Sequence, residues 1–181
     1  MKLIHCADLH LDSDMTSNLT KEKAKERRTE LLVTFQRMIT YAKENDVHHI
    51  LISGDLYDKK NISSTARNVF LTAVTDNQDI IFYYLKGNHD AESMFIGMNK
   101  IPDNLKLFGT EWTEYKITSE KDNNKIVISG IELTADNSDI IYNSLILDNN
   151  CFNIVMLHGQ HRLKAKMNIR AYQSDFLRIK G

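Results

Sequence analysis

Four short groups of polar residues each follow a run of apolar residues in this chain. They are "ADLH" at 7–10, "GDLYD" at 54–58, "GNHD" at 87–90 and "HG" at 158–159. Aspartate and asparagine offer oxygen ligands, and histidine offers a nitrogen ligand, to divalent cations such as manganese, iron and zinc. The four groups therefore predict a metal centre, provided that the fold brings them together.

The apolar runs between these groups predict the elements that would position them. Residues 20–45, and a segment that begins near Ser64, carry apolar side chains at helical spacing. Strands alternate with these helices, which favours an α/β fold with a parallel sheet and right-handed crossovers. The carboxyl ends of parallel strands meet along one edge of a sheet, where ligands bind. We expect five residues to converge there: Asp8, His10, Asp55, Asn88 and His158.

The second half of the chain has a different pattern. Residues 111–118 and 125–133 flank "SEKDNN" and predict a β-hairpin. A short helix at about 138–147, another strand ending at His158 and a last helix at 163–179 follow. Residues 161–181 carry six basic residues and one acidic residue, so this tail could contact a polyanion or simply form a solvated helix face.

Composition sets outer limits on the class of protein. The chain has 181 residues, 42% of them hydrophobic, which suits one domain with a real core. The net charge of -1 indicates no particular partner. No run of 18 apolar residues is present, and the N-terminus lacks the apolar segment of a signal peptide. We therefore expect a cytoplasmic protein with no membrane partner.

Taken singly, each polar group has an ordinary structural explanation. Asp8 and His10 could be a helix cap and a loop histidine, Gly54 and Asp55 a turn, and His158 a satisfied buried histidine. Together, carboxylates and imidazoles at a dry sheet edge stay uncompensated unless a cation binds among them. Asp55 follows a glycine on a tight turn and could reach two ions. Two-metal sites, with ions about 3.5–4 Å apart, activate a water for in-line attack at phosphorus.

The four groups resemble the signature of the calcineurin-like metallophosphoesterases: Asp-x-His, Gly-Asp-x-x-Asp, Gly-Asn-His-Asp/Glu and a later histidine. Within that superfamily the chain looks most like the SbcD-type double-strand-break repair nucleases. The similar stretches are "IHCADLHLDS", "ILISGDLYDKK" and "YYLKGNHDA". The resemblance covers nearly the whole chain and implies a four-layer αββα sandwich with a two-metal centre, usually of manganese.

The resemblance also implies a role for each site residue. Asp8 and His10 would hold the first metal, Asp55 would bridge both, and Asn88 and His158 would hold the second. His89 would steady the scissile phosphate and protonate the leaving oxygen. Asp90 would orient His89, and Asp58 would support the turn at Asp55.

Partners follow from the same resemblance. Family members of this type work as homodimers that dock on an SbcC-type coiled-coil ATPase and cut DNA. The dimer helices would fall at residues 64–77 and 92–101, although the apolar residues of the second segment could equally belong to the core.

One departure from the family pattern is large. The Gly-His-x-His motif of the family is absent from this sequence, and so is the cap domain that would follow it. We therefore treat 1–181 as a C-terminally incomplete metallophosphoesterase domain and expect weak metal binding and little activity from this chain alone. Two alternatives stay open: a phosphodiesterase or phosphatase for a small substrate, and a non-catalytic scaffold with the same fold. The intact Asp8, Asp55, Asn88 and His89 count against the scaffold.

Overall fold

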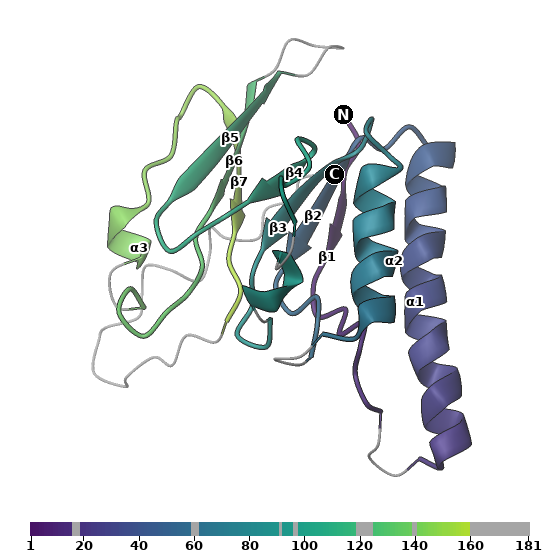
Figure 1. Cartoon of the computed structure of the whole chain (residues 1–181). Helices are drawn as coiled ribbons and strands as arrows, with labels where there is room; N and C mark the ends of the chain where they lie inside the picture. Colours follow the sequence, from purple (N-terminus) through teal and green to yellow (C-terminus); the bar gives the residue numbers. More distant parts are fainter. Residues whose placement is uncertain are drawn as a thin grey trace.

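The computed structural model describes seven parts of the chain: residues 1–15, 19–58, 62–90, 92–95, 98–118, 125–138 and 141–159. Within them it contains two β-sheets with two long helices packed beside the first (Figure 1). The helix predicted at 163–179 and the basic tail at 161–181 lie outside the described residues. None of the described helices is long and apolar enough to cross a lipid bilayer.

The first sheet is wholly parallel, as the alternation of strands and helices predicts. Its strands follow the order of the sequence: β1 (Ile4–Cys6), β2 (His49–Ser53), β3 (Ile81–Leu85) and β4 (Leu105–Leu107). The sequence did not indicate β4, which has only three residues and therefore too little pattern to detect. All four strands point their carboxyl ends the same way, which creates the expected edge.

Two helices cover one face of this sheet (Figure 1). Helix α1 (Lys21–Glu44) begins after Thr20, whose hydroxyl accepts a hydrogen bond from the Lys23 N–H at 3.3 Å. Helix α2 (Ser64–Thr75) begins after Ser63, whose hydroxyl accepts from the Ala66 N–H at 3.2 Å. Such caps satisfy backbone donors that the first helical turn leaves unpaired, and both helices begin close to the predicted positions.

The second sheet is mixed. Strands β5 (Thr113–Thr118) and β6 (Lys125–Gly130) form the predicted antiparallel hairpin, and β7 (Phe152–Met156) pairs with β6 in parallel. The short helix predicted before β7 is α3 (Ile141–Ser144), which is shorter than expected. A 3-10 helix, η1 (Glu92–Phe95), follows the first sheet's third strand.

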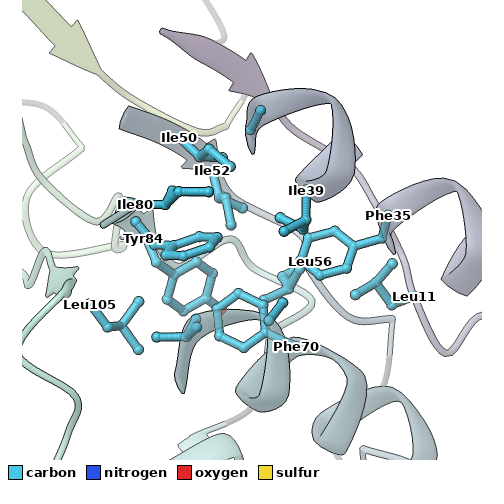
Figure 2. Packing of buried hydrophobic residues seen from close by; sticks show 14 of the residues in the cluster. Leu11, Phe35, Ile39, Ile50, Ile52, Leu56, Phe70, Ile80, Tyr84 and Leu105 are labelled. Atoms are coloured by element: carbon cyan, nitrogen blue, oxygen red, sulfur yellow. The ribbon is translucent and has the colours of Figure 1, made fainter. Parts of the chain in front are cut away.

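Apolar side chains fill two layers. One core lies between the helices and the first sheet, where Phe35 and Phe70 meet Ile50, Ile52 and Tyr84 (Figure 2). The other lies between the sheets, where Leu51 and Leu85 join Ile126, Ile128 and Met156. Because successive strand residues face opposite ways, Ile50 and Leu51 serve different cores.

The order of layers is therefore helix, sheet, sheet, as in the predicted sandwich. Figure 1 shows α3 on the far side of the second sheet from α1 and α2. Helix α3 thus occupies the position that the predicted sandwich assigns to its fourth layer.

Candidate metal centre

The loops that leave β1 and β2 run side by side, and this brings the first two polar groups together. The Asp8 N–H donates to the Gly54 carbonyl at 3.1 Å, and the His10 N–H donates to the Asp55 carbonyl at 3.0 Å. The pairing continues with Leu11 N–H and the Leu56 carbonyl at 2.9 Å. Asp8 and His10 thus lie beside Asp55 because the backbone pairing extends beyond the sheet.

Three of the five predicted ligands have left-handed backbone. The φ angles are 53° at Asp8, 44° at His10 and 50° at Asp55. Such angles are uncommon outside glycine and cost about 1–3 kcal/mol each when the surroundings impose them, most often at functional sites. Their concentration here indicates that the fold gives up stability to aim these side chains.

Asp8, Asp55 and His158 form a compact group. Each offers one ligand atom, and these atoms lie within 4.8 Å of one another. His158 follows β7, which belongs to the second sheet, so it reaches the edge of the first sheet from the opposite layer. The sequence predicts all the ligands at the edge of one sheet; instead the site lies where the two sheets meet.

The tautomer of His158 follows from its contacts. Its Nδ1 lies 2.9 Å from the Ser53 carbonyl, which can only accept, so Nδ1 carries the hydrogen. In the neutral ring Nε2 is then an acceptor, and it lies 3.2 Å from Asp55 Oδ2. Two acceptors at that distance repel each other unless a proton or a metal ion sits between them. The donor set therefore fits a divalent cation.

Gly54 makes room for this arrangement. Its φ of 83° is one that side chains rarely adopt, and a Cβ at this position would collide with the His158 imidazole. Glycine is therefore required at position 54 for two reasons: the backbone conformation and the close approach of His158.

His10 adjoins the same group. Its Nε2 is 4.0 Å from Asp8 Oδ1, and its Nδ1 is 3.4 Å from Asp58 Oδ1. Among the described residues, this buried Nδ1 has no partner in hydrogen-bonding geometry, a state that polar atoms in folded proteins rarely keep. The His10 ring thus lies between two carboxylates, with Nε2 toward Asp8 and Nδ1 toward Asp58, an arrangement that a bound cation would explain.

The loop after β3 brings His89 to the site. The His89 N–H donates to Asp55 Oδ1 at 3.0 Å, while its Nδ1 lies 3.3 Å from Asp58 Oδ1. The ring is edge-on to that of His10, with centroids 5.6 Å apart, and about half of the side chain is exposed. Asn88 is exposed in the same loop, and its place among the ligands stays a prediction.

Asp90 joins two loops beneath the site, and its expected role in orienting His89 stays a prediction. Its carboxylate is buried and accepts backbone hydrogen bonds from three residues: Gly87 at 2.9 Å, Leu56 at 3.2 Å and Tyr57 at 2.7 Å. These bonds join the loops after β2 and β3 beneath the site. The carboxylate in contact with His89 is that of Asp58 instead. The tight turn at Gly87, closed by the Asp90 N–H at 3.3 Å, aims Asp90 inward.

Two nearby tyrosines stay neutral. Burial, followed by the charge of Asp90, raises the pKa of Tyr84. Burial, followed by the charges of Asp12 and Asp90, raises the pKa of Tyr57. Neither phenol can therefore act as a base near neutral pH.

Sequence reasoning missed two other contributors. Asp12 is buried and accepts from the Asp58 N–H, although nothing but its closeness to His10 in the sequence marked it. Lys86 forms an ion pair with Glu132 at 3.5 Å, which ties the loop after β3 to the loop after β6. The position of Lys86 directly before "GNHD" was the one sequence feature that could have indicated this ion pair.

Comparison with known proteins places this arrangement in a family. A protein of Bacillus subtilis (strain 168), "Uncharacterized metallophosphoesterase YhaO", is 31% identical over 121 residues. The aligned part is 64% of this chain but only 29% of that relative. The sequence profile described as "Calcineurin-like phosphoesterase" matches residues 1–177. Because that match runs through all four polar groups, the chain belongs to the calcineurin-like phosphoesterase family.

Proposed function

We propose that the chain is the core of a metal-dependent phosphodiesterase that hydrolyses DNA, an SbcD-type nuclease. The observation that carries the hydrolytic part is the convergence of Asp8, Asp55 and His158 from three separate loops. The DNA substrate has different support, namely the resemblance of the sequence around these residues to the SbcD-type branch.

The group formed by Asp8, Asp55 and His158 could hold a metal ion, and we propose a centre of two divalent ions here, both manganese. Asp8 and His10 would hold the first ion, Asn88 and His158 the second, and Asp55 both. When bound, the ions would supply positive charge that polarises a phosphoryl oxygen and activates a water molecule.

The protein's own groups would do the rest. Asp55 is held in place because its Oδ1 accepts the His89 N–H while its Oδ2 faces His158. His89 has Nδ1 beside Asp58, which leaves Nε2 as the nitrogen that can reach a substrate. We propose that this Nε2 steadies a phosphate oxygen and gives its proton to the leaving oxygen.

Partners are proposals on the same basis. We propose a homodimer that docks on an SbcC-type coiled-coil ATPase and acts on DNA. Met94, in the segment considered for the dimer contact, is 1% exposed and packs in the core, so a dimer would have to use its neighbours. The alternative function is hydrolysis of a small phosphodiester or phosphomonoester at the same site.

The test is a pair of measurements on the 181-residue chain. Calorimetric titration with manganese measures binding, and cleavage of linear duplex DNA and of bis(p-nitrophenyl) phosphate measures activity. We expect manganese binding in the parent and its loss in Asp55→Asn. Asp79→Asn, an exposed acid at the opposite end of β3, is the matched control and should bind like the parent.

The outcomes separate the hypotheses. Cleavage of DNA by the parent supports the nuclease. Cleavage of the small diester alone supports the small-substrate alternative and contradicts the nuclease. Equal manganese binding by the parent and Asp55→Asn would show that the site is not where we place it.

A further inference from the structure

Asp12 lies directly beneath the candidate site. It follows His10 by two residues in the loop after β1, in a turn closed by the Ser13 N–H and the His10 carbonyl at 2.9 Å. The residue is only 5% exposed. A buried carboxylate is costly unless its oxygens are hydrogen-bonded, so the partners of Asp12 show what it does.

The two oxygens of Asp12 reach two different parts of the chain. Oδ1 accepts from the Asp58 N–H at 2.8 Å, and Oδ2 accepts from the Ser63 N–H at 3.4 Å. Asp58 lies three residues after Asp55, and Ser63 caps helix α2. Asp12 thus accepts from the backbone at two points of the segment that leads from β2 to helix α2.

Of the residues bound by Asp12, Asp58 is the one that contacts the candidate site. A single oxygen, Oδ1, lies 3.4 Å from His10 Nδ1 and 3.3 Å from His89 Nδ1. One ring belongs to a proposed metal ligand and the other to the proposed general acid. A displacement of Asp58 would therefore disturb both rings together.

We propose that Asp12 is a positioning residue, which fixes the backbone at Asp58 so that one carboxylate orients both His10 and His89. The geometric part stands on the contacts above, and the catalytic consequence rests on the proposed function. A carboxylate accepts at both oxygens, whereas the amide of an asparagine at this position would present an NH₂ group to one of the two N–H donors. Asp12→Asn must therefore give up one bond, and active-site geometry tolerates only about 0.5 Å of looseness.

The experiment compares Asp12→Asn with Asp14→Asn, the same chemical change at an exposed position of the same loop. The ring-proton chemical shifts of His10 and His89 are measured at fixed pH in the metal-free chain. Manganese affinity, turnover and melting temperature follow. We expect Asp12→Asn to move both sets of ring signals and to lower manganese affinity or turnover about 10–100-fold, the usual effect of losing an outer partner of a metal site. Asp14→Asn should do neither.

A double-mutant cycle tests whether Asp12 acts through Asp58. In an Asp58→Asn background, Asp12→Asn should cause little further loss, because the group that it positions is already changed. Equal losses in both backgrounds would overturn the proposal. So would a lower melting temperature with unchanged ring signals and manganese affinity, since that is the result of a purely structural role.

Two further outcomes are distinguishable. If the parent binds no manganese, the proposed function fails, and the ring signals alone decide the geometric role of Asp12. If Asp12→Asn does not fold, as judged by circular dichroism, Asp12→Ser takes its place. The serine hydroxyl can accept one N–H, and unchanged ring signals in that variant would contradict the proposal.

Discussion

His158 and Asp55 face each other at 3.2 Å, although they come from different sheets and lie far apart in the sequence. The orientation of the His158 ring is fixed, because its Nδ1 donates to the Ser53 carbonyl and its Nε2 therefore faces the Asp55 carboxylate. Asp55 in turn is anchored by the His89 N–H. A metal ion at this place would join the two sheets, so metal binding and the packing of the sheets should be coupled.

The first prediction tests the space that Gly54 provides. Gly54→Ala places a Cβ against the His158 imidazole and on backbone with a φ of 83°. We expect a loss of about 1–3 kcal/mol in the free energy of unfolding, because an alanine is strained at such an angle. We also expect weaker manganese binding, because His158 must move. Urea denaturation and calorimetry measure the two effects.

Gly109→Ala is the matched control for that substitution. A Cβ at Gly109 meets nothing within 4 Å, so the same chemical change should leave manganese affinity as it is in the parent. Equal manganese affinity in Gly54→Ala and Gly109→Ala would show that His158 does not depend on the space at Gly54.

The second prediction separates Asp90 from Asp58. Asp90→Asn replaces an acceptor of three backbone hydrogen bonds and should cost about 1–3 kcal/mol of stability, since a buried donor is left unpaired. Asp58→Asn changes a partly exposed carboxylate that contacts His10 and His89, so it should lower turnover with little effect on stability. Chemical denaturation and steady-state kinetics measure both variants. A larger stability loss in Asp58→Asn would reverse our assignment.

Much of the fold was accessible from the sequence because its elements carry strong patterns. The periodic apolar residues of α1 and α2 predict both helices close to where they begin in the structure. The strands before the polar groups were equally clear. Strand β4 was not, since three residues contain too little periodicity, and the predicted α3 was too long.

The site was predictable as a set of positions but not as a set of contacts. Motif order places Asp8, Asp55 and His158 at strand ends, and the structure brings these three together. The direction of each side chain depends on loop backbone that propensities do not encode. Asp90 turns inward to backbone donors while Asp58 turns toward the histidines, two directions that the sequence pattern did not indicate. Asp12 was missed for the same reason.

The third prediction concerns pH. His49 is buried at the start of β2, with Nδ1 3.4 Å from the Tyr83 hydroxyl. Burial, then His48 and the N-terminal amine, lower the pKa of His49. Burial, then Tyr115, raises the pKa of Tyr83 to about 12, so the phenol stays neutral.

Because the unfolded chain binds the His49 proton more readily, protonation of His49 favours unfolding. The free energy of unfolding therefore does not depend on His49 protonation above the unfolded pKa of about 6.5. It declines as pH falls below that value toward the lowered pKa of the folded chain. We expect His49→Gln to flatten the pH dependence of unfolding between about pH 5 and pH 7. Urea denaturation at several pH values measures it. A parallel pH dependence in the parent and His49→Gln would contradict this prediction.

The last prediction concerns His89. The proposed function makes it an acid that acts on the phosphate, not a metal ligand, and its half-exposed ring with Nδ1 beside Asp58 is consistent with that role. His89→Asn keeps the backbone N–H that holds Asp55, so the ligand group should persist. Because we expect little activity from this chain alone, the variant is tested in a chain extended through the Gly-His-x-His motif of the family. There we expect unchanged manganese stoichiometry and a fall in turnover of about 10²–10⁴-fold, the range of general acid catalysis. Calorimetry and phosphodiester cleavage, run on the same preparation, measure the two quantities. Loss of manganese together with turnover would instead make His89 a ligand, and unchanged turnover would remove it from the chemistry altogether.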